Sequence, residues 1–193
     1  MSGDYTRLPA GLPVPADDGA ADGLEGRELP DLALPSTRGG ELSLAGAAAG
    51  LLVAYVYPRT GTPGVASPAG WDDIPGARGC TPQSCAYRDA LADFRGLGAN
   101  LVGISAQTAA EQAEFAAREH IPYPLLSDDL LRLAHVLDLP TFAVEGRTLY
   151  RRLTFVAEAG RIVKVFYPVF PPDRDAAAVL AWLRDREPAS EAG

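Results

Sequence analysis

A continuous apolar run, Leu-Leu-Val-Ala-Tyr-Val-Tyr at residues 51–57, restricts the possible folds of this chain more than any other feature. The run lacks the alternation of a strand with one solvated face, and it is far shorter than the roughly 20 residues of a membrane span. Pro58 ends it. A strand of this kind is buried on both faces, as in a parallel sheet, so the sequence predicts an α/β fold.

Helix and strand patterns alternate along the rest of the chain. We expect helices over residues 82–97, 108–120, 130–137 and 173–186, and further strands over residues 100–105, 149–157 and 161–167. Ahead of the apolar run, the turn signal Arg38-Gly39-Gly40 separates two short extended segments, which predicts a β-hairpin within residues 29–44. This order predicts a thioredoxin-like fold, in which helices flank a mixed central sheet and a β-hairpin precedes it.

The two ends of the chain differ from its middle in composition. Residues 1–26 are rich in Gly, Ala, Pro and Asp and show no periodicity, and residues 188–193 have the same character. Such segments bury too little apolar surface to offset the entropy of ordering them. We therefore expect a flexible N-terminal tail over residues 1–26, one domain over residues 27–187 and a flexible C-terminal tail over residues 188–193.

Charge and composition exclude several classes of function. The net charge of −8 argues against nucleic acid or an anionic membrane surface as a partner. The first residues have neither the basic start nor the apolar segment of a secretory signal, so we expect a cytoplasmic protein. Two cysteines in 193 residues do not form a disulfide framework, and in a reducing compartment a close pair is more often redox-active or metal-binding.

These two cysteines, Cys80 and Cys85, lie at the expected start of a helix. Thr81 suits the N-cap position and Pro82 the first helical position. The free N–H groups and partial positive charge of a helix N-terminus favour an anion, and the thiolate is the reactive form of cysteine. Cys80 is therefore the candidate nucleophile.

Three segments resemble the peroxiredoxins, most closely the bacterioferritin comigratory protein or peroxiredoxin Q branch. The first is Cys-Thr-Pro-Gln-Ser-Cys-Ala-Tyr-Arg-Asp at residues 80–89. The second is Val-Gly-Ile-Ser at residues 102–105, followed by Tyr-Pro-Leu-Leu-Ser-Asp at residues 123–128. The third is Arg-Leu-Thr-Phe at residues 152–155. The resemblance covers residues 28–186, and the joint order of the segments is more specific than any one of them.

The resemblance implies a thiol-dependent peroxidase that reduces hydrogen peroxide and organic hydroperoxides. Cys80 would attack the peroxide and become a sulfenic acid, and Cys85 would condense with it to form an intramolecular disulfide. Arg152 would hold the peroxide oxygens and stabilise the charge on the leaving oxygen. The implied reductant is thioredoxin or a glutaredoxin-type dithiol, with no cofactor and no metal, and the implied assembly is a monomer or weak homodimer.

Helix geometry adds a condition to the disulfide. Five helical residues rise about 7.5 Å and end about 140° out of phase. A disulfide requires Cα atoms within about 7 Å and converging side chains. The turn that carries Cys80 must therefore unwind before Cys80 and Cys85 can be joined.

The sequence departs from the family at one place. The family motif is Pro-x-x-x-Thr-x-x-Cys, and here Pro58 and Thr62 begin it, but Val65 occupies the cysteine position. Cys80 comes only after the 15 residues 65–79, which we call the insert.

Two arrangements of the insert are open. It can bulge outward and leave Thr62 beside Cys80, or it can rebuild the pocket wall with residues such as Trp71 and Arg78. Thr62 is a candidate catalytic residue under the first arrangement only.

Other functions are also compatible with a close cysteine pair. A thioredoxin-like thiol–disulfide oxidoreductase usually has Cys-x-x-Cys, whereas this chain has Cys-x4-Cys. A non-enzymatic redox-sensing module would not need Cys80, Arg152 and the Thr-Pro helix start together. A zinc site would have to recruit His120 and His135, whose spacing of 15 residues matches no usual ligand pattern.

Overall fold

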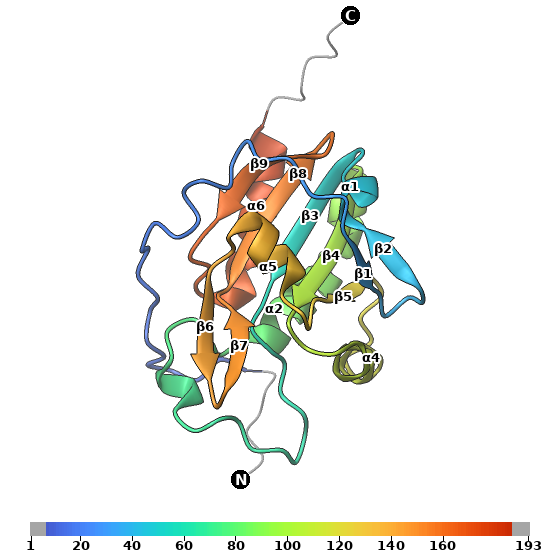
Figure 1. The fold of residues 1–193 in the computed structure, drawn as a ribbon. Coiled ribbons are helices and arrows are strands. Elements are labelled where there is room, and N and C mark those ends of the chain that lie inside the picture. Colours follow the sequence, from blue (N-terminus) through green and yellow to red (C-terminus); the bar gives the residue numbers. More distant parts are fainter. Residues whose placement is uncertain (1–6, 187–193) are drawn as a thin grey trace, which may run out of the picture.

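The structure, a computed structural model, describes residues 7–186 and centres on a five-stranded mixed sheet in the order β5-β4-β3-β8-β9 (Figure 1). The strands are β3 Leu51–Val56, β4 Ala99–Ser105, β5 Leu125–Ser127, β8 Leu153–Glu158 and β9 Arg161–Phe166. Strand β3 pairs parallel with β4 and antiparallel with β8, and every residue of β3 is buried. The predicted mixed sheet and its doubly buried strand are confirmed.

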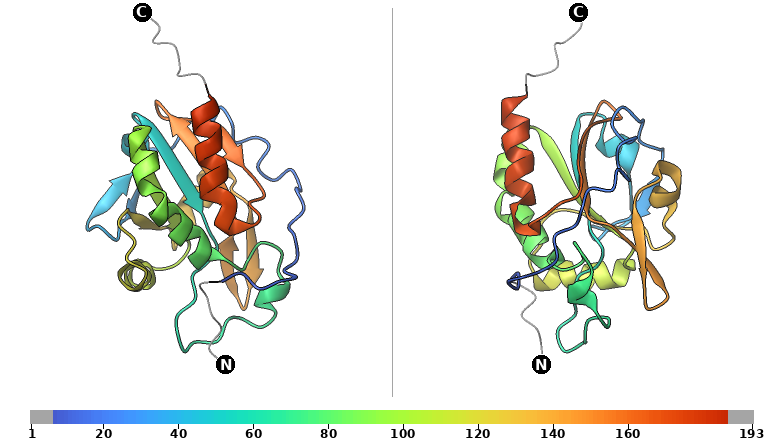
Figure 2. Two further views of the ribbon diagram at one scale, coloured as in Figure 1. Left: turned by 180° about the vertical axis from the view of Figure 1, so that it is seen from behind. Right: turned by 90° about the vertical axis from the view of Figure 1, so that its left-hand side faces the viewer.

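Helices and short strands cover both faces of this sheet. On one face lie α2 Cys80–Asp89, α3 Leu91–Gly96 and α6 Asp175–Asp185, shown in green and red in Figure 2. The other face carries α1 Leu44–Ala47 and α5 Arg132–Leu137, while α4 Ala109–Arg118 lies by β5. Alternate residues of β3 enter two separate hydrophobic clusters, with Val53 and Tyr55 in one and Leu52 and Ala54 in the other. Each face of the sheet thus has its own core.

Two small antiparallel pairs accompany the main sheet. The predicted N-terminal hairpin is confirmed as β1 Ala33–Pro35 and β2 Glu41–Ser43. The second pair, β6 Thr141–Val144 and β7 Arg147–Tyr150, differs from the expected single strand over residues 149–157. The chain turns at Glu145 and Gly146, both with positive φ, so β7 pairs back onto β6 and only β8 enters the main sheet.

The expected helix over residues 82–97 is divided and begins earlier than predicted. It is N-capped by Gly79 rather than Thr81, and it breaks at Ala90 into α2 and α3. Two short 3-10 helices, η1 Trp71–Asp73 in the insert and η2 Pro172–Arg174 before α6, were not predicted. None of the helices within residues 7–186 is long and apolar enough to cross a membrane.

Residues ahead of the boundary predicted at residue 27 contact the domain. Ala21 and Leu24 are buried in the core, and the backbone N–H of Gly26 donates to the carbonyl of Ile162 at 2.8 Å. Arg27 donates to the carbonyl of Leu137 at the end of α5, at 2.8 Å. The predicted C-terminal tail, residues 188–193, lies outside the described residues, as do residues 1–6 of the N-terminal one.

Candidate active site

Cys80 is the first residue of α2 and is 3% exposed. The preceding N-cap, Gly79, has φ of +105°, a backbone conformation that residues other than glycine rarely adopt. A Cβ at this position would lie 2.4 Å from Pro172 and 2.6 Å from Leu8, so only glycine fits. This tight approach fixes the start of α2, so Cys80 belongs to the first turn of the helix, where backbone N–H groups have no partner within the helix.

Arg152 brings a positive charge to the same point. It lies just before β8, is 3% exposed, and its Nη2 is 3.2 Å from Cys80 Sγ. The same nitrogen donates to the carbonyls of Gly76, Ala77 and Arg78 at 3.1–3.2 Å. The structure thus brings together Cys80 and Arg152, two of the predicted site residues, and ties the arginine to the end of the insert.

Buried hydrogen bonds link Arg152 through Gln83 to Asp175. Arg152 Nη1 donates to Gln83 Oε1, and Gln83 Nε2 donates to Asp175 Oδ2 at 2.7 Å. Tyr87 and Thr154 donate their hydroxyls to the same Asp175 oxygen, at 2.8 and 2.7 Å. Burial raises the pKa of Asp175, and these hydrogen bonds together with the charge of Arg152 oppose that rise.

Sequence reasoning missed Gln83 and Asp175 as parts of the site. A signal for Asp175 was present, since it shares helical spacing with Val179 and Leu183 on the buried side of α6. An acidic residue on an apolar stripe needs a buried polar partner. The sequence does not show which residue is this partner, because Gln83 is 92 positions away from Asp175.

Cys85 occupies the middle of α2 in a different environment. It is half-buried, and its Sγ lies 4.0 Å from Glu119 Oε2. Burial raises the pKa of the Cys85 thiol, Arg88 opposes the rise, and Glu119 adds to it. Both Cys80 and Cys85 are free thiols, as an intact α2 requires.

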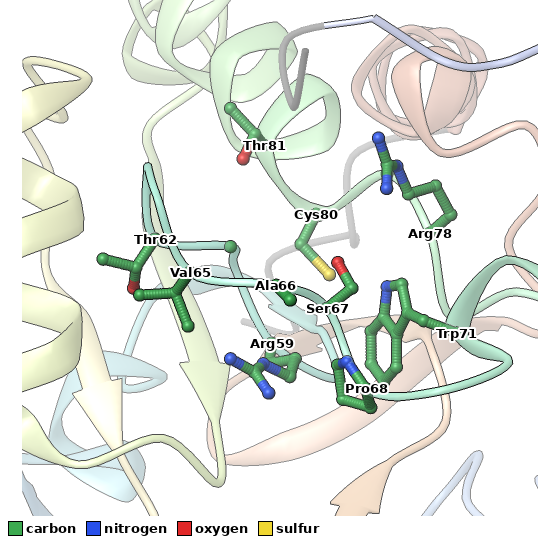
Figure 3. A pocket seen from close by; sticks show the side chains of 12 residues that line it. Arg59, Thr62, Val65, Ala66, Ser67, Pro68, Trp71, Arg78, Cys80 and Thr81 are labelled. Carbon is green, nitrogen blue, oxygen red and sulfur yellow. The ribbon is translucent and has the colours of Figure 1, made fainter. Parts of the chain in front are cut away.

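A small cavity beside Cys80 is lined by Thr62 and by residues of the insert (Figure 3). Its further lining includes Ser67, Trp71 and Arg78. The insert therefore forms part of the pocket wall, and Thr62 contributes to the same cavity. In Figure 3 Thr62 lies on the far side of Val65 from Cys80, so the structure combines elements of both predicted arrangements.

No group of three or more His, Cys, Asp or Glu side chains that could hold a metal ion occurs within residues 7–186. The groups that the structure does bring together at Cys80 are a thiol, a guanidinium and the first turn of a helix.

Comparisons with known proteins bear on this site. The profile of the Redoxin family matches residues 24–180. The chloroplastic peroxiredoxin Q of Arabidopsis thaliana is 29% identical over 161 residues, which cover 83% of this chain and 67% of that protein. Peroxiredoxin Bcp of Bacillus subtilis is 28% identical over 164 residues, covering 83% and 94%. The crystal structure of peroxidoxin BcpB from Mycobacterium tuberculosis has a TM-score of 0.69 at 28% identity, over 85% of this chain and 99% of that one.

The fold and the buried thiol–arginine pair define a thioredoxin-like redox protein. The chain belongs to the Redoxin family, whose profile covers most of its length. The relatives just described are peroxiredoxins of the Q or Bcp type, which confirms the predicted class and branch. They do not favour the alternatives of a protein thiol–disulfide oxidoreductase or a non-enzymatic redox module.

Proposed function

We propose that this chain reduces peroxides with Cys80 as the nucleophile. The Cys80 thiolate attacks one peroxide oxygen, the O–O bond breaks, and the other oxygen leaves as water or an alcohol after taking up a proton. The product is a sulfenic acid on Cys80. The observation that carries the proposal is the 3.2 Å contact between Arg152 Nη2 and Cys80 Sγ at a helix start, in a cavity that admits a small molecule.

Arg152 serves the reaction as a fixed hydrogen-bond donor. Because Gln83 and the backbone carbonyls hold its guanidinium, it needs no reorganisation when negative charge develops on the leaving oxygen. Cys85 resolves the sulfenic acid: its sulfur forms the disulfide with Cys80, and the sulfenic oxygen leaves as water. The raised pKa of Cys85 keeps it as a thiol until that step.

An external dithiol must then reduce the disulfide. We propose thioredoxin or a glutaredoxin-type donor as this partner, and a monomer or weak homodimer as the working form. The cytoplasm suits the cycle, because Cys80 must start reduced and thiols stay reduced there.

Peroxide consumption coupled to thioredoxin turnover tests the proposal. Cys80→Ser should abolish the reaction, because no other thiol lies at the helix start. Cys85→Ser should keep one rapid turnover and accumulate a sulfenic acid that dimedone labels, detected by mass spectrometry. Full activity in Cys80→Ser would end the assignment.

A further inference from the structure

We infer that the insert makes this protein selective for hydrogen peroxide over bulky organic hydroperoxides, with Trp71 as the main wall of the pocket. The inference rests on the proposed function and narrows the substrates expected from the sequence. It is carried by the size of the cavity at Cys80, by the residues that enclose it, and by the contacts that fix those residues in place.

The space beside Cys80 is small. Its volume is about 20 Å³, against about 500 Å³ for the pocket lined by Leu91 and Tyr123 elsewhere on the molecule. Hydrogen peroxide has only two heavy atoms and suits such a space, whereas the hydrocarbon part of an organic hydroperoxide would have to press against the residues that line it.

The insert supplies most of the enclosure. Five of its residues before Arg78 line the cavity, namely Val65, Ala66, Ser67, Pro68 and Trp71. Figure 3 shows Pro68 and Trp71 across the cavity from the helix start that carries Cys80. A peroxide that reaches the sulfur therefore has this wall against its second oxygen, where any alkyl group would project.

Trp71 is fixed by burial and by two neighbouring side chains. It is 6% exposed, its ring centroid lies 6.1 Å from that of Phe142 in β6, and the Arg59 guanidinium lies 6.0 Å from its ring. Burial of the indole stabilises this position of Trp71 more than the two contacts do, because a large aromatic side chain removes a large apolar surface from water. Trp71 is therefore a packed and fixed part of the pocket wall.

The chain on either side of Trp71 is also tethered. The N–H of Ala69 donates to Glu145 Oε1 at 2.9 Å, which joins the insert to the β6–β7 turn. Arg78 and Asp72 form an ion pair at 3.2 Å, although an exposed pair of this kind adds little free energy. These contacts oppose the displacement of the insert that an alkyl group beside Cys80 would require.

Rates of Cys80 oxidation by two peroxides of different size test the inference. We would measure sulfenic acid formation in the Cys85→Ser background, with hydrogen peroxide and with cumene hydroperoxide. The unchanged insert should favour hydrogen peroxide. Trp71→Ala should shift the ratio of the two rate constants toward cumene hydroperoxide by about tenfold or more, the scale on which pockets discriminate a few extra heavy atoms.

The second tryptophan of the chain provides a matched control. Trp182 lies on α6 against Phe166, away from the cavity lining, so Trp182→Ala should leave the ratio unchanged. If circular dichroism shows that Trp71→Ala does not fold, Glu145→Ala releases the Ala69 tether instead and should shift the ratio in the same direction.

Equal rate constants for the two peroxides in the unchanged insert would overturn the inference. A ratio that neither Trp71→Ala nor Glu145→Ala moves would overturn it as well. Failure of the proposed function looks different, because no peroxide would then oxidise Cys80 in any variant.

Discussion

At the scale of single residues, the orientation of one amide decides where the active-site arginine points. An amide can present either its oxygen or its NH2 group, whereas an ionised carboxylate can only accept hydrogen bonds. Asp175 Oδ2 accepts from Gln83 Nε2, so the Gln83 oxygen must face Arg152. Asp175 is therefore a positioning residue that acts on Cys80 through Gln83 and Arg152.

Asp175→Asn should slow Cys80 oxidation on the order of 10–100-fold, because a misplaced Arg152 no longer meets the leaving oxygen. The double change Gln83→Glu with Asp175→Asn should recover most of the rate, since the carboxylate then faces Arg152 directly and accepts from the amide at position 175. The measurement is the rate constant for sulfenic acid formation, with circular dichroism to check folding. A double variant no faster than Asp175→Asn alone would contradict the positioning role.

At the scale of elements, α2 carries both thiols and is held at its middle. Tyr123 donates its hydroxyl to the carbonyl of Ser84 at 2.8 Å, and Tyr55 donates to the Ser84 hydroxyl at 3.0 Å. Cys80 lies ahead of this anchor and Cys85 just after it. Because the two thiols cannot meet in an intact helix, the turn before Ser84 is the part that must open.

Oxidation should therefore expose backbone amides at the start of α2. Hydrogen exchange followed by mass spectrometry should show faster exchange at residues 83–85 in the disulfide form, since their hydrogen bonds to residues 79–81 are lost. The N–H of Gln83 donates to Gly79 at 3.1 Å in the reduced form. Peroxide-treated Cys85→Ser serves as the control and should keep its protection, because it forms no disulfide. Equal protection in the disulfide and reduced forms would refute this opening.

The elements also show what local sequence patterns can predict. The strand at residues 51–57 and the hairpin near Gly39 were predictable because burial on both faces and turn chemistry leave local signals. The strands β6 and β7 were not, because each is only four residues long and Glu145 adopts a positive φ that its residue type does not signal. Cys80 was predictable from the helix start, whereas Arg152 came from the family resemblance. The spacing of Asp175 on α6 indicated a buried carboxylate, but its partner Gln83 is too distant in the sequence for a local pattern to predict.

At the scale of the whole molecule, the N-terminal segment connects the core to the active site. Leu8 packs where a side chain on Gly79 would lie, and Pro15 packs beside Gly76 in the insert. Further along, Leu24 is 2% exposed within the same cluster as Leu44. A segment whose composition suggests a tail is thus placed by a few apolar side chains against the core and the start of α2.

Leu24→Ala tests whether this segment belongs to the folded unit. It should lower the free energy of unfolding by about 2–5 kcal/mol, the range for removing a buried leucine side chain. Val14 is 69% exposed in the same segment, so Val14→Ala should change that free energy by no more than about 0.5 kcal/mol. Urea unfolding followed by circular dichroism measures both. If residues 1–26 were a flexible tail, the two variants would unfold alike, because neither side chain would lose contacts on unfolding. A large difference between them therefore requires the segment to fold with the domain.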